Sequence, residues 1–173
     1  MSIKTCSLRK LTLASTVALG AGWGAMAQAQ TATANLDVST TVVASCTIGT
    51  TALAFGDYDP ISPSDLDSTG TVTVTCTQDA PVAITLGQGA NPGGTSTDAA
   101  PERRLSDGTN FLTYSLFSDS ARTTVWTNEA TGDVETTGTG AAEDHTVFGR
   151  VDGGQSSAPA GTYTDTVVAT VTF

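Results

Sequence analysis

Two stretches of this chain alternate apolar and polar residues with a period of two, and one of them stops at the last residue. Across residues 162–173, threonines fill most of one face, and the other face is apolar. That apolar face consists of Tyr163, Val167, Ala169, Val171 and Phe173. A period of two is typical of a half-buried β-strand. The sequence therefore predicts a core strand at the C-terminus.

The second alternating stretch covers residues 31–43, ahead of the cysteine at position 46. Its apolar face consists of Ala32, Ala34, Leu36, Val38 and Val42. Two interpretations stay open: the stretch is the first strand of the chain's own sheet, or it is a strand offered to another molecule. A sheet edge and an unattached strand in one chain are the ingredients of head-to-tail assembly by strand addition.

Residues 1–29 have the pattern of a secretory signal peptide. A basic start with Lys4, Arg9 and Lys10 precedes a short apolar stretch over residues 11–23, and small residues follow. Cleavage after Ala27 and cleavage after Ala29 both fit the small-x-small rule. No segment approaches the roughly 20 apolar residues that a membrane span requires. We therefore expect export and no membrane insertion.

Charge argues against nucleic acid as a partner. Removal of the signal peptide leaves no lysine, 17 acidic residues and four arginines, for a net charge of −13. The arginines are Arg103, Arg104, Arg122 and Arg150. A chain this acidic repels a phosphate backbone.

The two cysteines beyond the signal peptide, Cys46 and Cys76, predict one disulfide in an oxidising compartment. Closing a loop of 30 residues contributes about 3.7 kcal/mol on the loop-entropy model. A zinc site would need two further ligands nearby, and the sequence shows none. The acidic stretch 65–70 opens like a calcium loop, but position twelve is Cys76 where glutamate is required. We predict no cofactor and no metal.

Catalysis is not predicted either. His145 is the single histidine, and no G-x-S-x-G elbow accompanies it. The many carboxylates lie in glycine- and threonine-rich stretches, which lack the rigidity that a catalytic pair demands. Trp126 and Tyr114 could belong to a sugar-binding surface, but their strand-like spacing favours the core.

The composition predicts an all-β domain. Threonine supplies 30 of the 146 residues from position 28 onward, and no apolar stripe has the 3.6-residue period of a helix. Without helical crossovers, short strands separated by glycine-rich loops favour a sandwich. The expected strands cover residues 42–48, 52–55, 69–77, 82–86, 111–117, 123–127, 146–151 and 162–173.

Several motifs, in this order, carry a resemblance to a known family. They are Ser45-Cys46-Thr47-Ile48, Val74-Thr75-Cys76, Tyr114-Ser115-Leu116-Phe117-Ser118-Asp119, Arg122-Thr123-Thr124-Val125-Trp126, Val147-Phe148-Gly149-Arg150-Val151 and Gly161-Thr162-Tyr163-Thr164-Asp165-Thr166-Val167. Together with the signal peptide and the aromatic last residue, they make the chain resemble the spore coat protein U domain, the fold of major subunits of archaic chaperone-usher pili. The resemblance covers nearly all of the chain beyond the signal peptide.

This resemblance implies an incomplete immunoglobulin-like β-sandwich that lacks its final strand. A periplasmic pilus chaperone and an outer-membrane usher would handle the subunit, and the extension of a neighbouring copy would complete it. Residues 30–41 would be the donor strand and residues 42–173 the pilin domain. The donor side chains would be Ala32, Ala34, Leu36 and Val38, and the groove or chaperone edge would be Tyr163, Val167, Ala169, Val171 and Phe173.

The function implied is a secreted subunit of a surface fibre that serves adhesion or biofilm formation. The size of the chain favours a fibre shaft over a tip, since an adhesive tip subunit usually carries an additional domain. The alternative is a self-contained extracellular binding module, such as a carbohydrate-binding sandwich, or a spore-coat-like structural protein that folds alone.

Overall fold

The computed structural model describes residues 29–173. Residues 40–173 form one compact unit, and residues 29–39 lie outside it. Residues 29–45 lie in none of the strands, and their side chains are exposed, Leu36 by 87% and Val38 by 86%. The predicted signal peptide lies outside the described residues except for Ala29. Among the described residues, none forms a helix long and apolar enough to cross a bilayer.

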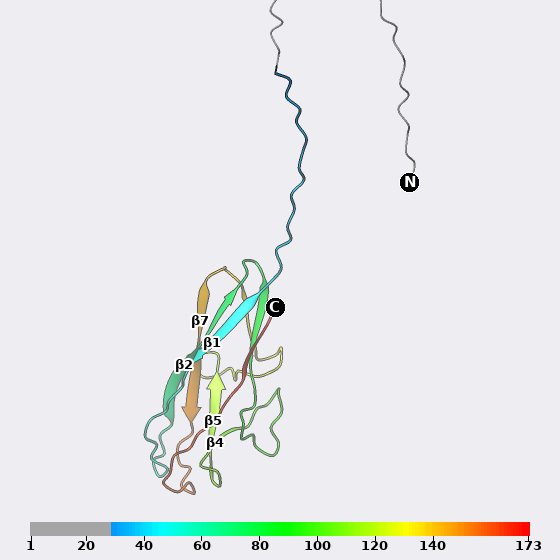
Figure 1. The fold of residues 1–173 in the computed structure, drawn as a ribbon. Coiled ribbons are helices and arrows are strands. Elements are labelled where there is room, and N and C mark those ends of the chain that lie inside the picture. The colour runs from blue at the N-terminus through cyan, green and yellow to red at the C-terminus, as the bar shows by residue number, and fades with distance from the viewer. Residues whose placement is uncertain (1–28) are drawn as a thin grey trace, which may run out of the picture. The chain divides into compact units, whose positions relative to one another are not determined.

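The described residues form eight strands in two antiparallel sheets. Figure 1 labels the strands of the first sheet. The first sheet has the order β1-β2-β7-β5-β4, and the second has the order β6-β3-β8. In chain order the strands are β1 Cys46–Thr51, β2 Leu66–Cys76, β3 Pro81–Leu86, β4 Arg103–Ser106, β5 Phe111–Phe117, β6 Val134–Thr137, β7 Ala142–Val151 and β8 Ala169–Thr172. This architecture confirms the predicted all-β, immunoglobulin-like sandwich.

The core lies between the inner faces of the two sheets. Every second residue of β3, of β5 and of β2 from Gly70 onward is buried, as the period-two patterns require. Trp126 is fully buried, and its indole nitrogen donates a hydrogen bond to the Ile84 carbonyl at 2.9 Å. Tyr114 is 6% exposed. Their predicted place in the core is confirmed, and neither ring can serve as a sugar-binding platform.

The strand predictions were wrong in several places. β4 and β6 were not predicted, because these four-residue strands are mostly polar and have the composition of loops. Residues 52–55 form no strand, and residues 123–127 contribute a single bridge between Val125 and Phe117. The first strand begins later than expected, and the strand predicted over residues 162–173 shortens to β8 plus one bridge between Thr164 and Ser106.

A buried arginine ties the two sheets together. Arg103, on the inner face of β4, is 1% exposed. Its guanidinium donates to the carbonyls of Leu86, Gly87 and Trp126, each at 2.8 Å. Burial lowers the pKa of Arg103 to about 10, so the side chain still carries its charge at neutral pH.

Replacing Arg103 with methionine should destabilise the domain. Three buried carbonyls would lose their donors, and we expect the free energy of unfolding to fall by about 2–4 kcal/mol. The comparison variant is Arg104→Met: Arg104 is half-buried, stacks on the Phe111 ring at 4.0 Å and donates to the carbonyls of Asn91 and Pro92 in a surface loop, where water can replace the lost donors, so its loss should cost less. Thermal unfolding followed by circular dichroism would measure both variants. Equal melting temperatures for the two would contradict the structural role of Arg103.

Candidate functional site: an open groove between the sheets

Each sheet has two edge strands, β1 and β4 in the first and β6 and β8 in the second, and the free edges of β1 and β8 border one opening. β1 ends the first sheet and pairs with β2 alone, and β8 ends the second sheet and pairs with β3 alone. The two strands lie next to each other. The sandwich is therefore open along the line between β1 and β8. An unpaired edge offers backbone N–H and C=O groups to an additional strand.

Side chains along this opening point toward the core but are only partly covered. Ile48 of β1 lies opposite Val74 of β2 on the inner face of the sheet. Val74 is 1% exposed, whereas Ile48 is 38% exposed. On the other wall, Val167 and Val171 pack against the core and are half-buried. The second sheet thus leaves the inner face of the first sheet partly uncovered at this edge.

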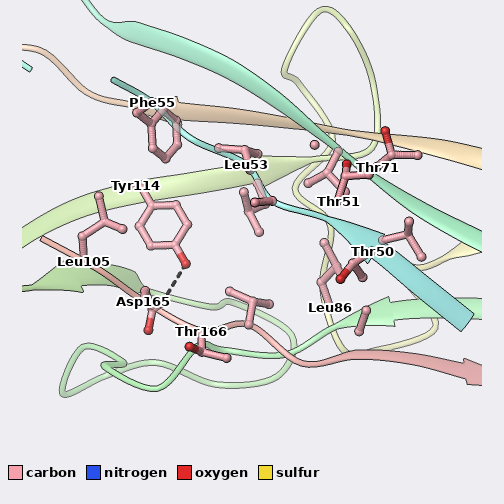
Figure 2. Close-up of a pocket in the computed structure, with 17 residues that line it drawn as sticks. Thr50, Thr51, Leu53, Phe55, Thr71, Leu86, Leu105, Tyr114, Asp165 and Thr166 are labelled. Atoms are coloured by element: carbon pink, nitrogen blue, oxygen red, sulfur yellow. Dashed lines mark hydrogen bonds between the residues drawn. The ribbon is translucent and has the colours of Figure 1, made fainter. Parts of the chain in front are cut away.

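Between these edges lies a groove with a cavity of about 270 Å³ (Figure 2). Core side chains line its floor, namely Val72, Leu86, Tyr114, Leu116 and Val147. Leu53 and Phe55 line one wall, and Val167 and Ala169 line the other. An adjoining cavity of about 570 Å³ continues the groove past Phe55 and Asp165 to Tyr163. We call the two cavities together the groove.

The segments that border the groove alternate like strands but lack a strand's pairing. Residues 163–171 alternate between half-buried and exposed, although β8 begins only at Ala169. Thr164 exchanges two 2.9 Å hydrogen bonds with Ser106, and the Val168 carbonyl accepts from Gly87 at 2.9 Å. Because backbone groups of successive residues point to opposite sides of a strand, those of Asp165 and Val167 point toward the groove. The strand predicted over residues 52–55 was wrong, and the one predicted over residues 162–173 forms only as β8 and one bridge, because the rest of these segments has no strand paired on its groove side.

Asp165 is the one charged side chain among the residues that line the 270 Å³ cavity. Its carboxylate accepts from the Tyr114 hydroxyl at 2.7 Å, from the Ala90 amide at 2.8 Å and from the Asn91 side chain at 3.1 Å. The Tyr114 bond is visible in Figure 2. Burial, and then the hydrogen bond to Asp165, raise the pKa of Tyr114, so its hydroxyl remains a donor.

A glycine makes room for this carboxylate. Gly89 has a φ of +87°, and a Cβ atom there would lie 2.2 Å from Asp165 Oδ2. Any other residue would therefore displace the carboxylate and strain the backbone. Asp165 and its glycine are functional candidates that the sequence analysis missed. The available signal was the period of two, which places Asp165 on the apolar face of the C-terminal stretch.

The structure brings most of the predicted C-terminal residues to this groove. Val167 and Ala169 line the main cavity, and Tyr163 lines the adjoining one. Val171 pairs with Ile84 next to the groove wall. Phe173 is 52% exposed and lines a separate surface cavity beside β3 and β6.

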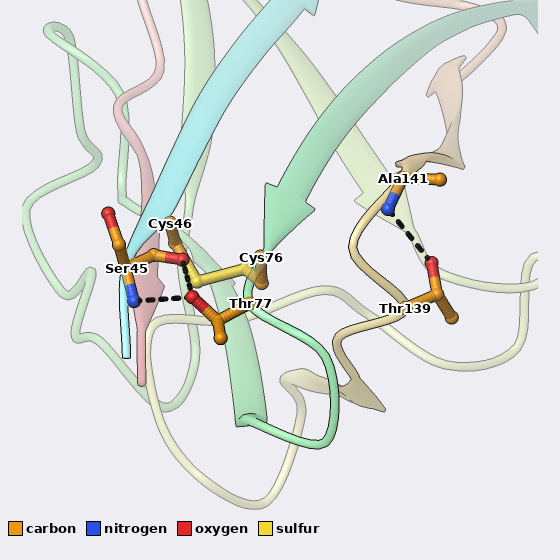
Figure 3. The surroundings of a disulfide bond; sticks show 6 residues. All are labelled: Ser45, Cys46, Cys76, Thr77, Thr139 and Ala141. Carbon is orange, nitrogen blue, oxygen red and sulfur yellow. Dashed lines mark hydrogen bonds between the residues drawn. A yellow bond between two sulfur atoms is a disulfide. The ribbon is translucent and has the colours of Figure 1, made fainter. Parts of the chain in front are cut away.

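A disulfide fixes β1 at the end of the exposed N-terminal segment (Figure 3). The sulfur atoms of Cys46 and Cys76 are 2.04 Å apart. The two residues are also cross-strand partners at the start of the β1–β2 ladder. Beside them, the Ser45 amide donates to the Thr77 hydroxyl at 3.0 Å. The groove wall formed by β1 is therefore held covalently at this end.

Residues 29–173 hold no group of three or more acidic, histidine or cysteine side chains placed to bind a metal. The carboxylates of residues 65–70, the stretch that opens like a calcium loop, contact arginines. Asp67 bonds Arg150 at 2.8 Å and Arg122 at 3.3 Å, and Asp65 lies 3.4 Å from Arg150. The hydrogen bond from Arg150 lowers the pKa of Asp67.

Comparisons with known proteins agree with this architecture. Residues 32–170 match the family model of the Spore Coat Protein U domain. The chain is 42% identical over 158 residues to Protein U of Myxococcus xanthus, covering 85% of this chain and 88% of that protein. It is also similar to a chain in the crystal structure of the CsuC–CsuE chaperone–tip adhesion subunit pre-assembly complex from the archaic chaperone-usher Csu pili of Acinetobacter baumannii.

That structural match has a TM-score of 0.54 and 23% sequence identity. It covers 77% of this chain and 40% of the solved chain, so the present protein spans less than half of that chain's length. At this level of identity the likeness concerns the fold alone.

Proposed function

The chain belongs to the Spore Coat Protein U domain family, and from this membership we propose that it is a structural subunit that polymerises head to tail. In each contact, the N-terminal segment of one copy fills the groove of the next copy as an added strand. The product is a surface fibre that serves adhesion or biofilm formation.

The observation that carries this proposal is the open groove between β1 and β8. A sandwich that leaves inner-face residues such as Ile48 exposed forgoes about 1.5–3 kcal/mol for each large apolar side chain that it fails to bury. An added strand would cover these side chains and pair with the edges of both sheets. A lone subunit should therefore be prone to aggregation.

The proposed occupant is the segment 30–41 of a second copy. It alternates as a strand must, lies in none of the strands of its own domain and exposes Leu36 and Val38. Ala32 and Ala34 complete the face that would point into the groove. Because the segment and the groove are different surfaces of one molecule, the contact is heterologous and produces a filament rather than a closed dimer.

The same proposal gives the chain its partners. A subunit with an open groove needs protection before assembly, and we assign that task to a periplasmic pilus chaperone that occupies the C-terminal edge. An outer-membrane usher would then join the subunits and export them. The signal peptide pattern and the fold shared with a chain from a chaperone–subunit complex support this route.

Electrophoresis of the secreted wild-type protein tests the proposal directly. Without heating, detergent gels should show a ladder of multimers, because each link buries apolar side chains and a row of backbone hydrogen bonds. Heating should collapse the ladder to a single subunit band. Electron microscopy should show thin fibres in the unheated sample. A monomer before and after heating would instead favour a self-contained binding module or coat component.

A further inference from the structure

The apolar faces of the groove wall and of the N-terminal segment are each interrupted by one polar residue. On the C-terminal stretch that forms the wall, the inner face runs Tyr163, Asp165, Val167, Ala169, Val171 and Phe173, and the first four of these line the groove. On the segment the corresponding face runs Ala32, Ala34, Leu36, Val38, Thr40 and Val42. Read in opposite directions, the two patterns match. From residue 163 upward on the wall, and from residue 42 downward on the segment, one aromatic or apolar residue is followed by one polar residue and then by four apolar residues.

We propose that Asp165 sets the register of the donated strand by accepting a hydrogen bond from the hydroxyl of Thr40 of the neighbouring copy. This inference rests on the proposed function and names a specificity-determining contact within the same groove. It makes the donated strand antiparallel to the C-terminal segment. All six strand pairs in the domain are antiparallel as well.

Placing Thr40 opposite Asp165 fixes every other pair along the C-terminal stretch. The pairs are Val42 with Tyr163, Val38 with Val167, Leu36 with Ala169, Ala34 with Val171 and Ala32 with Phe173. In this register a large side chain faces a small one in two pairs, Leu36 with Ala169 and Ala32 with Phe173. Close packing within a shared layer favours such pairs. Leu36 enters the groove beside Ala169, the smallest side chain of the wall.

The carboxylate of Asp165 has room for one more donor. A carboxylate offers about four acceptor sites. In the structure Oδ1 accepts from the Ala90 amide and the Asn91 side chain, and Oδ2 accepts from the Tyr114 hydroxyl. These three bonds fix the orientation of the carboxylate before any partner arrives. A hydroxyl from the donated strand can take the remaining site.

Other placements of the strand leave Asp165 without this partner. A shift by one residue turns the polar face of the strand inward. A shift by two residues puts Val38 or Val42 against the carboxylate. The valine excludes water from the charge and donates no hydrogen bond to replace it. A parallel strand with Gln30 opposite Asp165 would set Ala34 against Ala169 and Val38 against Phe173, so small faces small and large faces large.

The register also predicts how closely neighbouring subunits approach. The three residues 43–45 separate Val42, in the groove of one copy, from Cys46, at the start of β1 in its own domain. Such a linker spans at most about 14 Å. Adjacent domains must therefore nearly abut, and the disulfide of Cys46 lies at the junction.

Paired cysteines test the register in the full-length mature chain. Ala34→Cys with Val171→Cys places two thiols opposite each other in the proposed register. Ala34→Cys with Ala169→Cys does so in the parallel arrangement and in an antiparallel strand shifted by two. Under mild oxidation, the first pair should give at least about tenfold more cross-linked multimer than the second, because a mispaired carboxylate costs that much in the register equilibrium. Dominant cross-linking of the second pair would overturn the register.

Substitutions at Thr40 test the hydrogen bond itself. Thr40→Val keeps the shape of the side chain but removes the hydroxyl, so assembly from dissociated subunits should slow or weaken by about tenfold. Thr40→Ser should restore it. Thr41→Val is the matched control, since Thr41 faces away from the groove and should leave assembly unchanged.

Assembly of Thr40→Val at the wild-type level would overturn the role of Asp165. Failure of the register and failure of the proposed function remain distinguishable by electron microscopy. If wild-type subunits form fibres that the cysteines cross-link in the wrong pairs, the donor is correct and the register is wrong. If wild-type subunits form no fibres, the proposed function fails, and this inference fails with it.

Discussion

Leu36→Asp should abolish assembly while leaving the secreted subunit's own domain folded. The substitution removes the largest apolar side chain of the donated face and places a charge in a groove lined by Leu86 and Leu116. Lost apolar burial and desolvation of the carboxylate together should cost at least about 4 kcal/mol per link, or a thousandfold in affinity. Detergent gels without heating should then show the subunit band in place of a ladder.

The matched control for this variant is Asn35→Asp. It adds the same charge one residue earlier, on the face that points away from the groove, and should leave the ladder intact. Circular dichroism of both proteins checks that the domain itself is unaffected. If Leu36→Asp forms normal fibres, the donated segment has been wrongly identified.

Loss of the disulfide should produce the second large effect. In the double variant Cys46→Ser, Cys76→Ser, the covalent closure of a 30-residue separation disappears, which should lower the free energy of unfolding by about 3–4 kcal/mol. The melting temperature should fall by about 10 °C or more. The bond also anchors β1, which forms one wall of the groove. We therefore expect fibres of this variant to dissociate at a lower temperature than wild-type fibres.

Comparing the wild type with and without a reducing agent provides a control that needs no substitution. Reduced wild-type protein should melt near the double variant, and the double variant should not respond to the reductant. Identical melting of the oxidised and reduced wild type would contradict the stabilising role assigned to the Cys46–Cys76 bond.

The sequence correctly predicted strands that alternate apolar and polar residues and that pair with a neighbouring strand on both sides. β2 and β7 lie in the middle of the first sheet, and their buried residues follow the predicted period. Tyr114 and Trp126 were expected in the core because of their strand-like spacing, and both are buried there. In these segments, local pattern and tertiary environment demand the same conformation.

The errors have two physical causes. β4 contains Arg103 and Arg104, and a sequence pattern cannot show that the first is buried in the core among carbonyl groups while the second lies half-buried against Phe111 on the outer face. The second cause is the lack of a pairing partner. It explains why residues 52–55 and the first part of the predicted strand 162–173 form no continuous strand. Their alternation is genuine, and Leu53, Phe55 and Val167 do turn toward the core, but a strand also needs a partner.

Asp165 shows what the sequence could not supply. Its position in the alternation was visible, but its role depends on a tyrosine 51 residues away and on a glycine-lined loop far from it in sequence. Contacts over such distances follow from the arrangement of the sheets, which alternation does not specify.

Amide hydrogen exchange, measured on assembled fibres and on subunits dissociated from them, tests the central claim most directly. If the segment of one copy completes the sandwich of the next, amides of residues 32–42 and of residues 165–171 should exchange slowly in the fibre and much faster in the dissociated subunit, since a donated strand and its neighbours open only when the link breaks. Equally fast exchange of residues 32–42 in both samples would contradict the account.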